Sequence, residues 1–389
     1  MTRKGVWDLQ EVRDKYLESL WANPINLWGV GTGEYIGIND NSMSYSSPIQ
    51  VPGTDWSMVT MMEKGTGAVK EDGTLWAWGS NDSGALGQNQ PDNAGYSSPM
   101  QIGTNTNWTY VSGATEAMGA INSSGEMYVW GANPTGRLGL NDQTSRSSPT
   151  QVPGTTWAEL ALGAAAQGIY RKTDGTLWSC GRNNDGQLGQ NNETEYSSPK
   201  QIGTQTDWIQ ITCQNKGSWG MRSGGTLWGW GEQVDGNLGF NQAGGKFSSP
   251  KQVPGAWSDF TCSSTGAWGV KTDGTLWAWG NNNNGQLGHN DTTQYSSPRQ
   301  VGTDTTWAIV EGQRGNSTPD PGIKAVKTDG TLWGWGTNQQ GKLGLNNETN
   351  YSSPKQVGTG TKWSQKKGQM SLGLQASQQM TITLTPSQL

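Results

Sequence analysis

Hydrophobic and polar positions alternate with a short period along most of this chain. In the segment Gly67–Gly79, an apolar run leads to Asp72-Gly73, and large apolar residues recur after it. A period of two is typical of a β-strand, and Asp-Gly between two such runs favours a hairpin with a type I′ turn. A loop rich in Asn, Asp and Gly follows at 80–87, and a further strand begins at Ser-Ser-Pro. Proline at its start predicts an edge strand, because an edge tolerates the missing N–H.

Three sequence markers each recur seven times, at intervals of about 50 residues. A Trp-Gly unit ends at Gly31, Gly79, Gly131, Gly181, Gly231, Gly280 and Gly336. A Ser-Ser-Pro unit ends at Pro48, Pro99, Pro149, Pro199, Pro250, Pro298 and Pro354. A closing Trp stands at Trp56, Trp108, Trp157, Trp208, Trp257, Trp307 and Trp363. The last interval is longer for all three markers, which predicts an exposed loop around 316–322.

The repeats predict an all-β protein, a seven-bladed β-propeller of four-stranded repeats. Six Trp-Gly units follow a hairpin-forming half, whereas the first, at 27–31, does not. The missing half lies at the other end, because Gly368–Gly373 aligns with Gly163–Gly168. We therefore expect the N- and C-terminal segments to pair and close the ring, which removes exposed sheet edges. Residues 381–384 align with a third strand that 27–31 already supplies, so the tail either adds a strand or pairs differently.

Residues 1–25 differ from the repeats and are expected to form a leader before a propeller over 26–389. The spacing of Asp8 and Glu11 matches a capping box, which predicts one short amphipathic helix over 8–22 that ends before Pro24. This helix either packs on its own propeller or docks on another subunit. The residues of its apolar face and flanks are Trp7, Leu9, Val12, Tyr16, Leu20 and Trp21.

Composition restricts the classes of partner. The 389 residues include 22 Trp, which we expect to fill the wedges between blades. Only 15% of residues are charged, the net charge is −5, and no run of Lys or Arg occurs, so nucleic acid is not an expected partner. No apolar stretch is long enough to span a membrane, and the start lacks the apolar region of a secretion signal. We expect synthesis in a cytoplasm and no membrane insertion.

Residues suited to catalysis or metal binding are sparse. The 3 Cys give no disulfide framework and are expected to be small buried hydrophobic residues. The single His289 lies in a polar loop, which disfavours a zinc site or a Ser-His-Asp triad. Carboxylates that could serve a polysaccharide-acting enzyme fall in separate loops, at Asp82, Asp92, Glu193 and Asp235. No cofactor, metal or enzymatic activity is expected, and such an enzyme is the least favoured alternative.

The segment Asp273–Gly280, followed by Asn-Asn-Asn-Asn-Gly-Gln-Leu-Gly at 281–288, resembles the repeat of the regulator of chromosome condensation family. The resemblance extends from residue 26 to about 376 and implies a seven-bladed propeller. The founding member is an exchange factor for a small GTPase and binds chromatin, but its basic character is absent here. Plant ultraviolet-B photoreceptors share the repeat. Their Gly-Trp-Arg-His-Thr motif is missing, and Trp219 and Trp268 fall three positions further along the strand.

The leader carries a second resemblance. Residues 4–15 are similar to leader segments of structural proteins of tailed marine bacteriophages. This similarity implies a virion structural protein of the tail-fibre, receptor-binding or decoration type, located in the virion. Its leader would attach to other virion proteins and its propeller would face outward. The alternative is a cytoplasmic protein-interaction scaffold, such as a GTPase exchange factor.

A row of aromatic residues precedes the Ser-Ser-Pro units, with Arg146 as the exception. Aromatic rings beside polar side chains suit sugar binding, so this row predicts a platform for a host surface glycan or protein. Repeat symmetry alone also predicts this recurrence, so packing within each repeat is the favoured interpretation. The residues are Tyr45, Tyr96, Tyr196, Phe247, Tyr295 and Tyr351.

Overall fold

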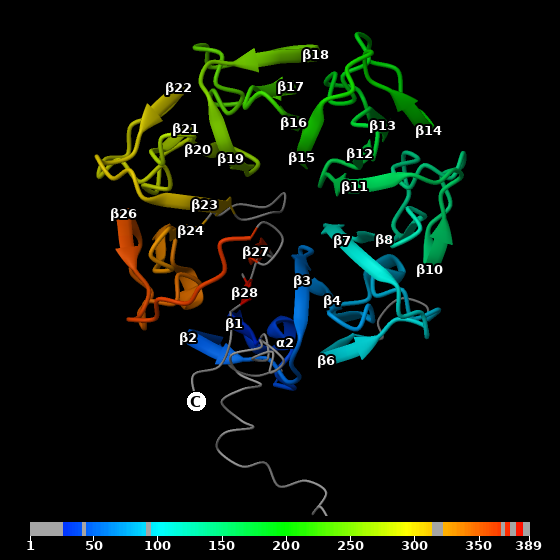
Figure 1. The fold of residues 1–389 in the computed structure, drawn as a ribbon, viewed down its shortest axis with the longest axis horizontal. Coiled ribbons are helices and arrows are strands. Elements are labelled where there is room, and N and C mark those ends of the chain that lie inside the picture. Colours follow the sequence, from blue (N-terminus) through cyan, green and yellow to red (C-terminus); the bar gives the residue numbers. More distant parts are fainter. Residues whose placement is uncertain are drawn as a thin grey trace, which may run out of the picture.

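A computed structural model describes residues 26–40, 44–90, 95–312, 322–366, 370–373 and 379–383. These residues form antiparallel four-stranded sheets arranged as blades around a central axis (Figure 1). The all-β propeller architecture is therefore confirmed. The leader, its expected helix over 8–22 and most of the loop around 316–322 lie outside the described residues, so the boundary at residue 25 stays a prediction.

Six blades each consist of four strands that are consecutive in the chain. The first strand of each blade begins at the closing Trp and lies innermost: β3 (Trp56–Met61), β7 (Trp108–Ala114), β11 (Trp157–Leu162), β15 (Trp208–Gln214), β19 (Trp257–Cys262) and β23 (Trp307–Gly312). The second strands are β4 (Gly65–Lys70), β8 (Ala117–Asn122), β12 (Gln167–Lys172), β16 (Gly217–Arg222), β20 (Gly266–Lys271) and β24 (Gly322–Lys327).

The two outer strands of each blade contain the other markers. The third strands carry the Trp-Gly unit: β5 (Leu75–Gly79), β9 (Met127–Gly131), β13 (Leu177–Gly181), β17 (Leu227–Gln233), β21 (Leu276–Gly280) and β25 (Leu332–Gly336). The fourth strands carry Ser-Ser-Pro: β6 (Tyr96–Gln101), β10 (Arg146–Gln151), β14 (Tyr196–Gln201), β18 (Gly245–Val253), β22 (Tyr295–Gln300) and β26 (Tyr351–Gln356). Each fourth strand lies at a sheet edge, as its proline predicts.

A further sheet, in the order β2-β1-β28-β27, joins segments from the two ends of the described chain. It contains β1 (Leu27–Thr32), β2 (Ser44–Gln50), β27 (Met370–Gly373) and β28 (Gln379–Thr383). The two ends pair as expected, and of the two arrangements left open for the tail the structure has the different pairing. Residues 379–383 pair with β1 at the place of a second strand, and 370–373 lie beyond them. Because β1 already fills the third place, the tail cannot take it.

Short helical turns complete the described elements. They are α2 (Gly33–Ile36), which follows β1 and was not predicted, and the 3-10 turns η1 (Asp82–Gly84) and η2 (Gln339–Gly341). Within α2, Tyr35 and Ile36 are buried. The Tyr35 carbonyl accepts hydrogen bonds from Thr66 Oγ1 (3.1 Å) and Trp78 Nε1 (2.9 Å), so α2 fastens β1 to the neighbouring blade β3–β6.

The Asp-Gly turns do not have the predicted type I′ geometry. Within 71–73, only Gly73 has a positive φ, of 77°. Its N–H donates to the Lys70 carbonyl (2.9 Å), which gives a type I turn followed by a left-handed glycine. Asp72 Oδ1 accepts the backbone N–H (3.0 Å) and the hydroxyl (2.6 Å) of Thr74. In this turn the Asp72 side chain bonds to the residue two positions ahead, an Asx-type arrangement that favours the observed type I geometry.

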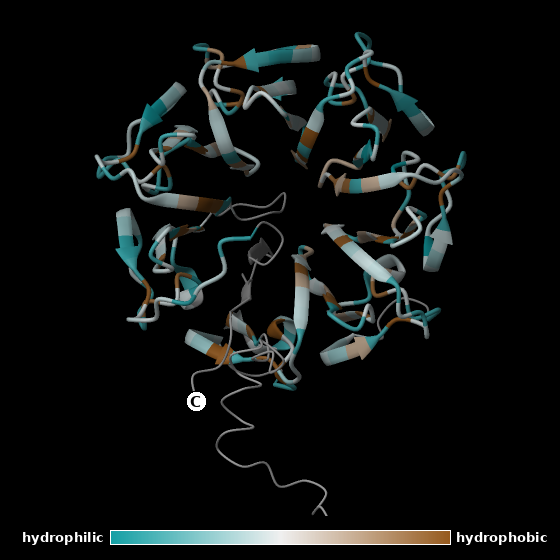
Figure 2. Cartoon of the chain, viewed as in Figure 1, coloured by the Kyte–Doolittle hydropathy of each residue, from teal (hydrophilic) through white to brown (hydrophobic). Residues whose placement is uncertain are grey.

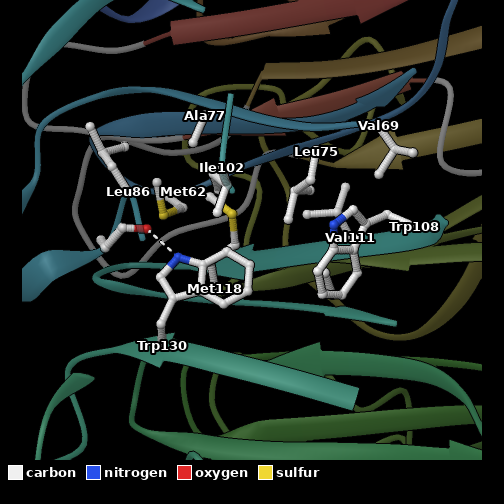
Figure 3. Packing of buried hydrophobic residues seen from close by; sticks show 12 residues of the cluster. Met62, Val69, Leu75, Ala77, Leu86, Ile102, Trp108, Val111, Met118 and Trp130 are labelled. Carbon is white, nitrogen blue, oxygen red and sulfur yellow. Dashed lines mark hydrogen bonds between the residues drawn. The ribbon is translucent and has the colours of Figure 1, made fainter. Parts of the chain in front are cut away.

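The hydrophobic core lies between neighbouring blades. Figure 3 shows one cluster in which Val69 and Leu75 of one blade pack with Val111, Met118 and Trp130 of the next. The outer strands are largely polar by comparison (Figure 2). The expected Trp packing is confirmed, since nine Trp of the described residues are at most 1% exposed: Trp56, Trp78, Trp130, Trp219, Trp230, Trp257, Trp268, Trp279 and Trp335. Cys180, Cys213 and Cys262 are free and buried, also as expected.

One backbone hydrogen bond recurs between neighbouring sheets. In the loop after each third strand, an Asn with positive φ donates its N–H to the carbonyl of the first serine in the next Ser-Ser-Pro unit. These bonds are 2.6–3.0 Å long. The pairs are Asn39 with Ser97, Asn89 with Ser147, Asn141 with Ser197, Asn191 with Ser248, Asn241 with Ser296, Asn290 with Ser352 and Asn346 with Ser46.

Candidate functional site

The first strands of the six blades surround a central cavity of about 310 Å³. Each of these strands contributes to its wall, and Arg171 reaches it from β12. The wall combines apolar, hydroxyl, amide and charged groups. Among the lining residues are Met58, Tyr110, Glu159, Gln210, Thr261 and Glu311.

Glu159 joins three strands at this cavity. Its Oε2 accepts a hydrogen bond from Arg171 Nε (3.0 Å), and its Oε1 accepts the backbone N–H of Ile211 from the next blade (3.2 Å). The side chains of Glu159 and Arg171 are 12% and 19% exposed. Such shielding strengthens a charge-assisted pair relative to one at the surface. Glu159 therefore fixes the position of the guanidinium in the cavity wall.

Asp259 makes a similar junction on the neighbouring blade. Its Oδ2 accepts the backbone N–H of Val310 (2.9 Å), and its Oδ1 accepts a bond from Gln210 Nε2 (3.3 Å). Asp259 is 5% exposed. The carboxylate thus links β15, β19 and β23 around the axis. Because these bonds use its acceptor sites for structure, Asp259 is poorly placed to serve as a general base.

Ile209 is an exposed hydrophobic residue beside the cavity. Three large hydrophobic side chains are exposed in the described part of the chain: Met100 (37%), Ile209 (46%) and Val234 (37%). Of these three, Ile209 lines the cavity. It follows Trp208 at the start of β15 and combines exposure with a place in the cavity wall. An exposed apolar side chain beside a cavity with polar walls suits contact with another protein.

Five second strands end in a cation that lies between two aromatic rings. Lys172 Nζ, for example, is 4.8 Å from the ring centroid of Trp157 and 4.6 Å from that of Trp178. Sequence reasoning missed these cages, although a signal was present: the cation always precedes the half-buried Trp by six residues. The cations and their rings are Lys70 with Trp56 and Trp76, Lys172 with Trp157 and Trp178, Arg222 with Trp208 and Trp228, Lys271 with Trp257 and Trp277, and Lys327 with Trp307 and Trp333.

Equivalent pockets occur along the seams between blades. Three have volumes of about 300, 430 and 390 Å³. Each is lined by the loop after a third strand, by the linker to the next closing Trp and by the proline of the neighbouring Ser-Ser-Pro unit. These prolines are Pro250, Pro298 and Pro48. The pockets are far smaller than a protein domain and suit single side chains or small ligands.

The predicted aromatic row lies at or near the start of the outer strands, and its side chains are half-buried. Asn192 donates to Tyr196 Oη (3.2 Å), Tyr295 Oη donates to Asp291 Oδ2 (3.1 Å), and Asn347 donates to Tyr351 Oη (3.2 Å). The remaining contacts are Tyr45 Oη to Asp40 (2.6 Å), Tyr96 Oη to Gln90 (3.4 Å) and the ring of Phe247 against Phe240 (4.8 Å). These contacts hold the long loops in place, and glycan binding by the row stays a prediction.

The other predicted residues are not brought into one site. Trp7, Leu9, Val12, Tyr16, Leu20 and Trp21 lie outside the described residues. Asp82 pairs with Lys64 (2.9 Å), and Asp235 accepts a bond from Asn281 (2.9 Å) in a different blade. His289 packs against the ring of Tyr295 (5.1 Å), and burial lowers its pKa.

The described residues contain neither a metal-binding cluster nor a membrane-spanning helix. Within these residues, no group of three His, Cys, Asp or Glu side chains is placed to hold a metal ion. In the same part of the chain, no helix has the length and apolar character needed to cross a membrane.

Similarity to known proteins covers parts of this chain. Over 140 residues the chain is 26% identical to the ultraviolet-B receptor UVR8 of Arabidopsis thaliana. The aligned region covers 35% of this chain and 32% of the receptor. Over 129 residues the chain is 26% identical to the human E3 ubiquitin-protein ligase HERC2. This aligned region covers 32% of the chain and 3% of the ligase. The matched region is less than two thirds of either relative.

Solved structures share the fold at low sequence identity. Human WBSCR16 superposes with a TM-score of 0.79 and 18% identity, covering 94% of this chain and all of that structure. Yeast RCC1 (Prp20), in a complex with Kap60, superposes with a TM-score of 0.79 and 16% identity, covering 100% and 95% of the two chains. The profile of the regulator of chromosome condensation (RCC1) repeat matches residues 72–117, 124–164, 174–217, 273–311 and 329–378, more than half of the sequence. The chain therefore belongs to the RCC1 repeat family.

Proposed function

We propose that this protein is a protein-interaction scaffold whose propeller binds another protein over the entrance of the central cavity. The observation that carries the proposal is the exposed Ile209 beside a cavity with charged walls. Interfaces combine an apolar anchor with surrounding polar groups, and Ile209 with Glu159 and Arg171 offers that combination.

The bonds across the cavity wall give this surface a fixed shape. Glu159 and Asp259 each tie their own first strand to the next one. A surface that is already ordered loses little conformational freedom on binding, which favours affinity.

The relatives support an interaction role in general terms. Prp20 of Saccharomyces cerevisiae, a fold neighbour at 17% identity, has binding properties toward Gsp1p and histones. Nucleotide exchange on a GTPase is a narrower form of the scaffold hypothesis, and it stays a prediction for this chain. The relatives lend no support to a virion role. That role rests on the resemblance of the leader and stays a prediction, which mass spectrometry of purified virus particles would test.

We also propose that the sheet β2-β1-β28-β27 acts as a seventh blade and closes the ring. Two bonds support this arrangement: Asn346 donates to the Ser46 carbonyl (3.0 Å), and Asn39 donates to the Ser97 carbonyl (2.8 Å). They have the same donor and acceptor positions as the bonds between the other blades. A closed ring leaves no sheet edge at either end of the repeat array.

A photo-crosslinking experiment tests the proposed surface. A photoreactive amino acid is placed at Ile209 in the full chain, and at the similarly exposed Val234 as a matched control. After irradiation in extract from the source cells, we expect one protein to be cross-linked at position 209 and identified by mass spectrometry. The proposal fails if position 209 gives no specific adduct, or if the same adduct forms at position 234.

A further inference from the structure

One of the seam pockets contains two cations. It lies between the blades β15–β18 and β19–β22 and has a volume of about 430 Å³. Lys251 enters from β18 and Lys271 from β20. Asn241, Gln252 and Ser297 supply polar groups to the same pocket. The site lies away from the central cavity and does not depend on the proposed function.

Aromatic rings position both ammonium groups. Lys251 Nζ lies 4.6 Å from the ring centroid of Phe240 and 4.8 Å from that of Phe247. Lys271 Nζ lies 3.4 Å from the ring centroid of Trp277. Within the described residues, neither lysine forms an ion pair. Contacts with ring faces stabilise a cation but leave N–H donors available to a ligand.

The repeats show what this seam lacks. At the preceding seam, Arg222 Nε is paired with Asp207 Oδ1 (2.6 Å), and at the following seam Lys327 Nζ is paired with Asp304 Oδ2 (2.6 Å). Both aspartates belong to the linker before a closing Trp, which spans 203–207 and 302–306. The corresponding linker at this seam is only Pro254-Gly255-Ala256 and contains no carboxylate. The cation of Lys271 therefore loses the partner that its two counterparts have.

A second cation adds charge to the same seam. Lys251 occupies the position after Ser-Ser-Pro, where Lys200 and Arg299 stand in the neighbouring blades and Thr150 stands beside the cage of Lys172. Partial burial also lowers the pKa of Lys271, which means that its charged form is under-solvated. Asp273 stabilises the charge of Lys271 from a distance, but no carboxylate pairs with either lysine in the described residues, so the two cations in one pocket favour a ligand that carries negative charge.

We propose that this pocket binds an oxyanion, a phosphate or sulfate group, through the ammonium groups of Lys251 and Lys271. Asn241, Gln252 and Ser297 can donate further hydrogen bonds to its oxygens. The oxyanion is either a free ion or a group carried on a larger molecule such as a sugar. Both sources present the same oxygens to the two lysines.

Calorimetric titration at constant ionic strength tests the site with three probes: inorganic phosphate, glucose 6-phosphate and glucose. We expect saturable binding of at least one phosphate compound and none of glucose. Binding of both indicates a site that accepts the free ion, whereas binding of glucose 6-phosphate alone indicates a carried phosphate group. Absence of saturable binding by both phosphate compounds overturns the proposal.

Variants assign the binding to this seam. We expect Lys251→Gln and Lys271→Gln each to weaken binding at least about tenfold, since each removes a charge-assisted contact. Ala256→Asp places a carboxylate where the preceding seam has Asp207, so it should pair with Lys271 and weaken binding similarly. Ala256 is exposed, so we expect this variant to fold normally, which circular dichroism checks. Lys172→Gln removes an equivalent caged cation and should leave binding unchanged. Equal weakening by Lys172→Gln would contradict the assignment.

Discussion

The indole Nε1 of Trp130 donates a 2.9 Å hydrogen bond to the carbonyl oxygen of Ala85 in the preceding blade (Figure 3). Both residues are almost fully buried. The same bond joins Trp230 to Gln187 and Trp335 to Gln286, at 3.0 Å each. The Trp that directly precedes the glycine of a Trp-Gly unit therefore both packs in the seam and satisfies a buried carbonyl of the neighbouring blade.

Trp130→Phe tests this bond. We expect it to lower the free energy of unfolding by about 3 kcal/mol, because it leaves the Ala85 carbonyl unsatisfied and opens a small cavity. Trp178→Phe is the matched control. Its Nε1 bonds to Thr176 Oγ1 at a half-buried position, so we expect a loss of about 1 kcal/mol. Urea unfolding measures both, and equal losses would argue against a special role for the bond between blades.

One blade replaces this Trp with Cys180, and Tyr170 compensates. The Tyr170 hydroxyl donates a 2.6 Å bond to the Arg137 carbonyl, the position that corresponds to Ala85. Tyr170 stands where the neighbouring second strands have Ala120 or Gly220. The phenol thus fills the space and makes the bond that an indole makes elsewhere.

We expect Tyr170→Ala and Cys180→Trp each to destabilise the protein by about 3 kcal/mol, through a cavity and through overpacking. The double variant restores the arrangement of the other blades and should recover most of the loss. A double-mutant cycle in urea measures the coupling. Additive losses would mean that the two side chains do not compensate each other.

Lys324 predicts a pH dependence of stability. It is fully buried on β24 and donates to the Leu343 carbonyl, and burial holds its pKa well below the ordinary value of 10.5. Between the lowered pKa and 10.5, the unfolded chain binds a proton that the folded chain does not. The free energy of unfolding therefore rises with pH in this window.

Lys324→Met should raise stability at pH 7 and remove this rise, because methionine has no proton to lose. Urea unfolding at pH 7, 8 and 9 measures the slope, with the exposed Lys200→Met as a control that keeps it. If Lys324→Met retains the full pH slope of the wild type, the slope does not come from Lys324.

Alanine substitutions at Gly73 and Gly103 distinguish the cost of a steric clash from the cost of backbone strain. Both have positive φ, 77° and 62°. A Cβ on Gly73 would lie 2.1 Å from the Thr106 carbonyl oxygen, whereas one on Gly103 would meet nothing within 4 Å. We expect Gly73→Ala to cost about 3 kcal/mol and Gly103→Ala about 1 kcal/mol, measured by thermal unfolding. Similar costs would show that strain dominates at both turns.

The repeat pattern predicts most of the blade structure, because buried and exposed positions alternate along each strand and the same positions pack in the core of every blade. The turn type could not be predicted from Asp72-Gly73, since the side-chain bonds to Thr74 decide it. The pairing of the tail was left open because the tail matches the repeat poorly, and its position depends on pairing with β1 over a long sequence separation.

The sites were harder to predict than the blades. The cation cages join a first, a second and a third strand, so they appear only when strands are assembled. The short linker before Trp257 was visible in the sequence, but its meaning depends on the ion pairs of Arg222 and Lys327 at equivalent seams. The cavity wall likewise combines residues from six separate repeats.

The affinity of the cross-linked protein for this propeller tests the central claim most directly. With the purified partner, we expect Ile209→Asp to weaken binding at least about tenfold, since it removes the apolar anchor and places a charge beside Glu159. Val234→Asp, an equally drastic change at an exposed site outside the cavity lining, should leave the dissociation constant within about twofold. An unchanged affinity for Ile209→Asp, with circular dichroism confirming the fold, would contradict binding at the cavity entrance.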